Sequence, residues 1–163
     1  MVYKRVILKR GKEESLKRFH PWVFSGAIAR MDNIEEGDLV TVYDHEGNLI
    51  GNGHYQIGSI AVRILTFNDT EIDSAFFVKR LTEAYKMRQA LGLSRPDNNA
   101  FRLVHGEGDF LPGLVVDIYG STAVMQAHSP GMHFARNLIA DALTRLPNGV
   151  VKNVYYKSET TLP

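Results

Sequence analysis

Cysteine is absent from this sequence of 163 residues. Its absence excludes a disulfide scaffold, a thiolate zinc site and a cysteine nucleophile within the chain. Long apolar runs are missing too, because the short run near the start ends where Lys9 and Arg10 bring charge back. Such a run is too short for a signal peptide or a membrane-spanning helix, so we expect a cytoplasmic protein with no membrane partner.

The sequence also lacks an excess of charge of one sign, since its net charge is only +1. The charges are nevertheless unevenly distributed along the chain. Residues 1–30 carry eight Lys or Arg side chains against two acids, whereas residues 31–60 carry six acids and no Lys or Arg. Two explanations remain open at this point. The basic segment forms a surface for a polyanion, or the two segments pair with each other in the fold.

The first 70 residues are rich in β-type runs, with a short helical turn expected at 13–18. A hairpin is the natural interpretation of residues 38–55, because the turn residues 45–48 separate two such runs. Gly51 and Gly53 inside the second run indicate a bulge or a close approach of another backbone. With further strands at 3–9 and 59–66, the pattern predicts a small β-barrel-like domain over residues 1–69.

The pattern changes to helical spacing after Asp69. Phe77, Leu81, Ala84, Tyr85, Arg88 and Leu91 share one helix face, and Asp73 or Thr70 is available as the N-cap. We therefore expect a connecting helix over 70–92. Strands at 101–105, 114–119, 122–128 and 150–156 and a helix that starts at Ser129-Pro130 and ends at Pro147-Asn148-Gly149 then predict a second domain over 93–163, with strands around one helix. The fold class is α+β.

The segment around the only tryptophan combines positive charge with flat rings. Lys17, Arg18, His20 and Trp22 lie within six residues, and Arg10 precedes them. Cations neutralise phosphates and flat side chains stack on unpaired bases, so these five residues are candidate RNA contacts. The alternative is that Trp22 and its neighbours Val23 and Phe24 belong to the core.

A second segment, from Arg102 to Asp117, concentrates ionisable residues among glycines. His105, Glu107 and Asp109 alternate, which would suit acid–base catalysis, hydrolysis or a metal if the backbone were a regular strand. Glycines at 106, 108 and 113 favour a shaped turn instead, with Asp109 accepting hydrogen bonds from backbone N–H groups. No Walker loop and no strand–glycine loop–helix occurs, so we expect no Rossmann domain, no cofactor site, no metal and no catalytic residue in this chain.

These two segments together resemble a known family. The stretch from Lys9 to Gly26, followed by Gly37-Asp38-Leu39-Val40, is similar to the N-terminal PUA domain of S-adenosylmethionine-dependent methyltransferases that modify large-subunit ribosomal RNA, of the 5-methylcytosine type. The run Arg102 to Asp117 is similar to the middle domain of that family. The resemblance covers essentially the whole chain. It implies an RNA-facing role for Lys17, Arg18, His20 and Trp22, and a place for Arg102, Glu107 and Asp109 in shaping a cleft between domains.

The resemblance also implies that the chain lacks the catalytic domain of the family. In the family a Rossmann-like domain with the cofactor loop and a catalytic cysteine lies downstream, so S-adenosylmethionine is expected for the parent protein and not for this chain. We therefore interpret the chain as the RNA-recognition front end of a methyltransferase acting on ribosomal RNA, not catalytic by itself. The alternative is a stand-alone RNA-binding or protein-interaction module. A homodimer is compatible with either interpretation.

Overall fold

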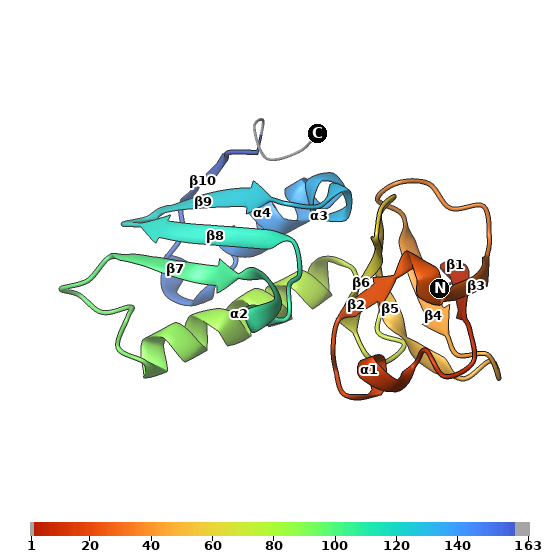
Figure 1. The fold of residues 1–163 in the computed structure, drawn as a ribbon. Helices are drawn as coiled ribbons and strands as arrows, with labels where there is room; N and C mark the ends of the chain where they lie inside the picture. Colours follow the sequence, from red (N-terminus) through yellow and green to blue (C-terminus); the bar gives the residue numbers. More distant parts are fainter. Residues whose placement is uncertain (1, 159–163) are drawn as a thin grey trace. The chain divides into compact units, whose positions relative to one another are not determined.

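The computed structural model describes residues 2–158, which form two compact units that divide between Ile72 and Asp73. The first unit is mainly β structure and the second combines helices with a sheet (Figure 1). The predicted α+β fold class is confirmed.

The first unit is built on one curled sheet of six strands in the order β2-β6-β5-β4-β1-β3. Strand β1 runs parallel to β4, and the other neighbouring strands are antiparallel. A core of β-branched and leucine side chains, among them Val6, Val23 and Leu16, is enclosed by the sheet and by the short helix α1. The elements are β1 Lys4–Leu8, α1 Glu14–Lys17, β2 Trp22–Phe24, a 3₁₀ turn Ser25–Ala27, β3 Ile28–Met31, β4 Leu39–Tyr43, β5 Leu49–Tyr55 and β6 Ile60–Thr66.

The two glycines of β5 confirm the expectation of close backbone approach. A Cβ atom on Gly53 would lie 2.1 Å from the Arg63 carbonyl oxygen, and one on Gly51 would lie 2.2 Å from the Thr66 carbonyl oxygen. The pairing of β5 with β6 also shifts register between Asn52 and Gly53. Only glycine lets β6 pack this closely, since any side chain would meet a backbone atom.

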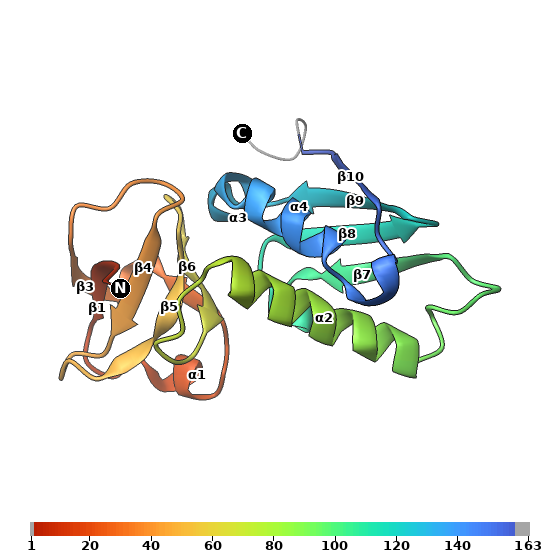
Figure 2. The same cartoon turned by 180° about the vertical axis from the view of Figure 1, so that it is seen from behind.

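The second unit packs helices on one face of a four-stranded sheet of order β10-β9-β8-β7. Helices α2 and α4 lie on the same face in both views of the molecule (Figures 1 and 2). Strand β10 runs parallel to β9. The elements are α2 Ser74–Ala90, β7 Ala100–His105, a 3₁₀ turn Gly106–Asp109, β8 Leu114–Tyr119, β9 Thr122–Ala127, α3 Pro130–Phe134, α4 Arg136–Thr144, a 3₁₀ turn Pro147–Gly149 and β10 Asn153–Tyr156.

Both helix starts expected from the sequence are present. The Asp73 carboxylate accepts a hydrogen bond from the Phe76 N–H at 3.0 Å, and the Ser129 hydroxyl accepts one from the Met132 N–H at 3.3 Å. These contacts satisfy N–H groups that have no partner within the helix. Of the two candidate caps for the longer helix, Asp73 is the one used.

The structure differs from the expected pattern in three places. Helix α2 was expected as a connection, but it belongs to the second unit because Phe77 and Leu81 are fully buried there. Strands therefore pack with more than one helix, and the helix expected after Ser129 divides at Ala135 into α3 and α4. Strands β2 and β3 were not expected, because each has only three or four residues and turn-forming residues lie close by.

Candidate nucleic-acid interface

Strand β2 places neighbouring side chains on opposite faces of the sheet. Val23 is 1% exposed and belongs to the core, whereas Phe24 is 49% exposed and Trp22 is half-buried. The indole ring of Trp22 meets the Phe24 ring edge-to-face at 6.3 Å and the His20 ring at 5.5 Å. The core interpretation of this segment therefore holds for Val23 alone, because the two-residue period of a strand sends Trp22 and Phe24 outward.

The end of helix α1 determines where Arg18 and His20 lie. Leu16 anchors the helix in the core, and the backbone then turns at Phe19, which adopts a left-handed conformation with φ of 65°. The Ser15 carbonyl accepts hydrogen bonds from both the Arg18 and His20 N–H groups, at 3.1 Å each. This tight turn brings the chain from the cationic helix end directly into β2.

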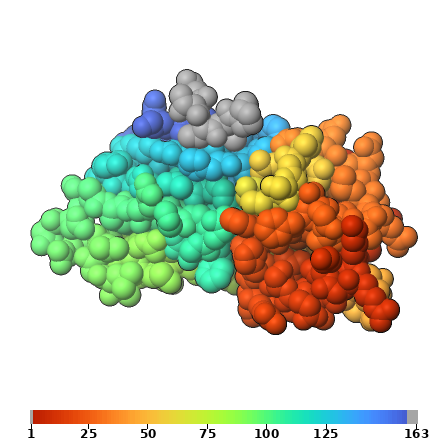
Figure 3. Space-filling model, in the orientation of Figure 1, coloured from red at the N-terminus to blue at the C-terminus, as the bar shows by residue number. Residues whose placement is uncertain are grey.

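The candidate cations are exposed at the surface of the first unit. Lys17 and Arg18 end the α1 segment, and Arg10 and Lys12 lie in the turn that follows β1. Within residues 2–158 no ion pair involves Arg10, Lys12, Lys17 or Arg18. Figure 3 shows the beginning of the chain, in red and orange-red, as one continuous area of this unit's surface.

The acidic segment neutralises only part of the basic one. Lys4 pairs with Asp38 at 3.0 Å and Arg5 pairs with Asp32 at 3.4 Å. The pairing explanation therefore holds for part of the basic segment, and the surface for a polyanion stays a prediction. The start of β1 is paired with the acidic segment, and the cations from Arg10 to Arg18 are left for solvent or a ligand.

A pocket of about 310 Å³ lies beside β2. It brings Trp22 together with side chains that the sequence interpretation did not select, above all Lys12, Ser15 and Phe24. Lys17, Arg18, His20 and Arg10 do not line it. The signal that could have identified Phe24 was the alternation of Trp22, Val23 and Phe24, which places the two rings on one face if the segment is a strand. The full lining is Lys12, Ser15, Leu16, Trp22, Val23, Phe24, Gly26 and Ala27.

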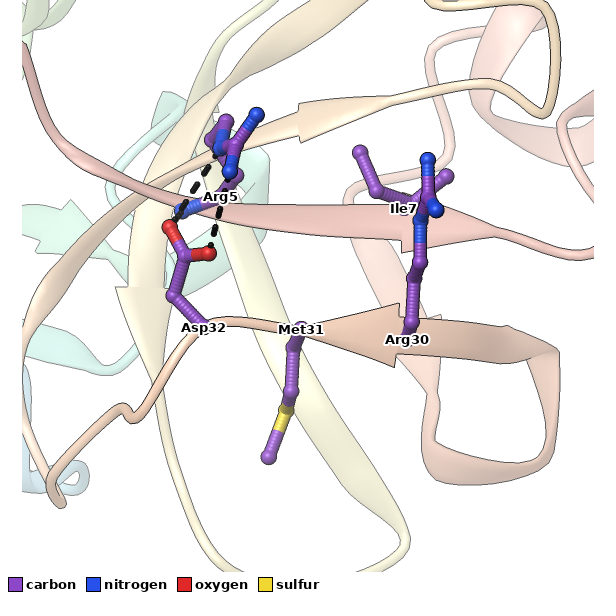
Figure 4. Close-up of a pocket in the computed structure, with 5 residues that line it drawn as sticks. All are labelled: Arg5, Ile7, Arg30, Met31 and Asp32. Atoms are coloured by element: carbon purple, nitrogen blue, oxygen red, sulfur yellow. Dashed lines mark hydrogen bonds and ion pairs between the residues drawn. The ribbon is translucent and has the colours of Figure 1, made fainter.

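A second pocket, of about 230 Å³, lies at the β1–β3 edge and is less suited to a nucleobase. Figure 4 shows Asp32 turned toward Arg5, while Arg30 extends beside Ile7. Hydrogen bonds from the Arg5 backbone N–H, and next from its guanidinium, hold the pKa of Asp32 below its ordinary value. Asp32 therefore stays a carboxylate beside two arginines, and the pocket has no aromatic ring on which a base could stack.

The loop between β7 and β8 uses its carboxylate to hold the backbone. The Asp109 carboxylate is 2% exposed and accepts a hydrogen bond from the His105 N–H at 2.7 Å, as expected for a shaped turn. Arg88 of α2 donates to both carboxylate oxygens, at 3.0 and 2.7 Å, and to the Arg102 carbonyl at 2.9 Å. The position of Arg88 on the apolar face of the predicted helix was the sequence signal for a buried partner.

Arg102 and Glu107 have different surroundings from Asp109. Arg102 is paired across the β7–β8 strands with Asp117, at 2.8 and 3.2 Å, and this partner raises the pKa of the arginine. Glu107 is exposed. Among the described residues, no three His, Asp or Glu side chains gather as a metal site would require. The assignment of Arg102, Glu107 and Asp109 to a cleft between domains stays a prediction.

No helix within residues 2–158 is both long enough and apolar enough to cross a membrane.

Comparison with known proteins agrees with the resemblance seen in the sequence. Residues 6–67 match the family described as a PUA-like domain. The chain is 41% identical over 145 residues to ribosomal RNA large subunit methyltransferase I of Escherichia coli, and 40% identical over 148 residues to the Klebsiella pneumoniae protein of the same name. These stretches cover 87% and 89% of this chain but only 36% and 37% of the relatives, so the chain spans about a third of their length.

Two solved structures share the fold at low sequence identity. A candidate SAM-dependent methyltransferase from Streptococcus mutans superimposes with a TM-score of 0.79 and 18% identity, covering 97% of this chain and 41% of that one. A candidate methyltransferase in complex with SAH gives a TM-score of 0.80 and 18% identity, covering 97% and 40% of the two chains. A fold similar to that of this chain is therefore found within larger proteins.

Proposed function

Because residues 6–67 form a PUA-like domain and the chain is homologous to part of the ribosomal RNA large subunit methyltransferases, we propose that it recognises and positions ribosomal RNA for methylation. The observation that carries the proposal is the joint exposure of cations and aromatic rings between Arg10 and Phe24. Phosphate contacts supply affinity without sequence information, and stacking on flat side chains adds contacts to unpaired bases.

The five predicted contacts divide into two roles in this proposal. Arg10, Lys17 and Arg18 neutralise phosphates, because they are exposed and no described acid pairs with them. Trp22 and His20 offer ring faces beside them. Arg102, Glu107 and Asp109 shape the chain further along, and Asp109 does so through its buried contacts with Arg88 and the His105 backbone. Asp109 thereby holds the β7–β8 loop, and the place of Arg102 and Glu107 beside a cleft between domains stays a prediction.

The methyl transfer itself belongs to a part of the parent protein outside these 163 residues. The relatives extend well beyond the matched third, and one solved neighbour was crystallised with SAH. A Rossmann-like domain would bind S-adenosylmethionine there. Calorimetric titration of the 163-residue chain with S-adenosylmethionine should give no binding, whereas a low-micromolar signal would place a cofactor site in this chain and contradict the assignment.

Salt dependence of RNA binding tests the phosphate contacts. Affinity for a single-stranded RNA should fall with salt, with a slope of log affinity against log salt of about −0.7 for each phosphate contacted. The double variant Lys17→Ala/Arg18→Ala should flatten this slope by about 1.4, because two contacts are lost. Fluorescence anisotropy of a labelled RNA at several salt concentrations measures both values.

A matched control separates a local site from net charge. Lys4→Ala/Arg5→Ala removes the same two charges, but from residues already paired with Asp38 and Asp32. We expect this control to change the slope by less than the Lys17/Arg18 variant. Equal slopes for the two double variants would mean that net charge and not a local site determines binding, and binding that ignores salt would contradict the phosphate contacts altogether.

The alternative function is a stand-alone module that binds RNA or a protein and has no enzyme attached. The observation that separates the two is the coding sequence after the codon for Pro163. A strand–glycine loop–helix followed by a cysteine motif supports the methyltransferase, and a stop codon removes it. A homodimer stays a prediction, which sedimentation equilibrium of the chain measures.

A further inference from the structure

The pocket beside β2 has the shape and chemistry of a site for a single flat ring. Its volume is about 310 Å³, and apolar side chains supply most of its lining. Two aromatic residues of β2, Trp22 and Phe24, contribute to the wall, with ring centres 6.3 Å apart and planes nearly perpendicular. A flat ligand that enters can therefore stack on one ring and meet the edge of the other.

Polar groups in the same pocket suit a nucleotide better than an apolar ligand. Lys12 and Ser15 are among the residues that line the pocket, and the Ser15 side chain makes no hydrogen bond to another described residue. Lys17 and Arg18 directly follow Ser15 and Leu16 along the chain. An aromatic wall with a lysine and a hydroxyl, flanked by exposed cations, complements a base attached to a phosphate backbone.

We infer that this pocket takes one unstacked nucleobase of the bound RNA, with Trp22 and Phe24 as the stacking surface and Lys12 on the adjoining phosphate. The inference rests on the proposed function, since it assigns one base of the RNA to a defined place on the first unit. It also distinguishes two parts of the interface. Lys17 and Arg18 contact the backbone irrespective of base, whereas the pocket requires that a base be present and unpaired.

Gly26 offers a variant that fills the pocket without disturbing the fold. It lines the pocket, its φ lies outside the left-handed region, and a Cβ atom there would meet no atom within 4 Å. Gly26→Leu should therefore occupy space meant for the base while the first unit stays folded. Ala29→Leu adds the same side chain at an exposed position of β3 that lines neither pocket, and it serves as the matched control.

Trp22 reports directly on the pocket because it is the only tryptophan of the chain. The 163-residue protein is titrated with hexauridylate RNA, and with the same oligomer carrying abasic ribose at every position, while tryptophan fluorescence is followed. We expect the RNA to quench the fluorescence and the abasic oligomer to leave it nearly unchanged. Stacking of one base corresponds to about a 5- to 150-fold gain in affinity, so Gly26→Leu should lose that factor for hexauridylate and Ala29→Leu should not.

The outcomes separate this inference from the proposed function. If Gly26→Leu and Ala29→Leu bind hexauridylate equally, or if the abasic oligomer quenches as strongly as the RNA, the pocket holds no base although RNA binding stands. If no RNA of any kind binds, both proposals fail. Thermal unfolding followed by circular dichroism verifies folding, and Phe24→Ala, which removes a half-exposed ring, repeats the test should Gly26→Leu unfold.

Discussion

Arg88 of α2 and Asp109 of the β7–β8 loop form a two-pronged ion pair within the second unit. Their N–O distances are 3.0 and 2.7 Å, and the two side chains are only 11% and 2% exposed. The pair joins the helix to a loop that starts 16 residues after the helix ends. The same arginine also donates to the Arg102 carbonyl, so α2 holds both strand β7 and the loop that follows it.

Removal of Arg88 should strongly destabilise the second unit. Arg88→Met leaves the Asp109 carboxylate buried without its charged partner, and such a change costs about 3–5 kcal/mol of unfolding free energy. Denaturant unfolding measures the loss. Arg145→Met is the control, because Arg145 pairs with Asp141 at the surface, with side chains 59% and 51% exposed, and should cost less than about 1 kcal/mol. Equal losses for the two variants would contradict the prediction that an unpaired buried Asp109 carboxylate is more costly than a broken surface pair.

The two faces of β2 should give opposite mutational results. Val23→Ala removes two carbons of a side chain that is 1% exposed, so it should cost about 2 kcal/mol of stability and weaken RNA binding less than Phe24→Ala does. Phe24→Ala removes a ring that is 49% exposed, so it should cost under about 1 kcal/mol but weaken RNA binding. Unfolding curves and RNA anisotropy are compared for both variants. If Phe24→Ala is the more destabilising of the two, the outward position of Phe24 on β2 is contradicted.

The sequence predicted the longer elements and missed the short ones for a physical reason. Helix α2 carries a periodic pattern long enough to identify, and the turn residues 45–48 indicate where strand β5 begins. The helix caps Asp73 and Ser129 have local chemistry that needs no tertiary contact. Strand β2 has three residues and gains its order from pairing with β6, which lies about 40 residues further along the chain. A contact of that range leaves no local signal that the segment is a strand, and the alternation of Trp22, Val23 and Phe24 places Phe24 outward only on a strand.

The same distinction applies to the candidate sites. Exposure of Lys17 and Arg18 follows from their charge, because an unpaired cation is rarely buried. The place of Lys12 in the pocket depends on how the turn after β1 packs beside β2, and that is a property of the tertiary fold. Asp109 was expected to hold backbone N–H groups from its position among glycines, but its pairing with Arg88 joins residues 21 positions apart. Only the periodicity of α2 hinted at it.

Substitution of Gly53 by any residue with a side chain should destabilise the first unit, whereas substitution of Gly26 in the same unit should not. A Cβ atom at this position would lie 2.1 Å from a backbone oxygen, so Gly53→Ala forces β5 away from β6 and should cost at least about 1–3 kcal/mol. Gly26→Ala is the matched control. Its Cβ meets open space, and loss of backbone freedom in the unfolded chain should leave stability unchanged or raise it by about 0.4–1 kcal/mol. Denaturant unfolding should therefore give changes of opposite sign or clearly different size.

His54 should make the first unit sensitive to mild acid. The side chain is 4% exposed in β5, its Nδ1 atom has no hydrogen-bond partner among the described residues, and burial lowers its pKa from 6.5 to about 4, with a further contribution from the Arg63 guanidinium. Between pH 6.5 and about pH 4, the His54 imidazole is protonated in the unfolded chain but neutral in the folded chain. Stability should therefore fall as the pH drops from 6.5 toward 4, by about 3 kcal/mol over the whole interval.

Paired variants isolate this contribution from that of the carboxylates. Hydrogen bonds from backbone N–H groups lower the pKa values of Asp32, Asp38 and Asp44, so their stabilising contribution is lost mainly below pH 4. Unfolding free energies at pH 7, 6, 5 and 4.5 thus report chiefly on His54. His54→Gln should flatten the dependence in this range, even if it lowers stability at pH 7, whereas His128→Gln removes an exposed histidine and should keep the slope. If the His54 variant retains the wild-type slope, the buried imidazole does not cause the acid sensitivity.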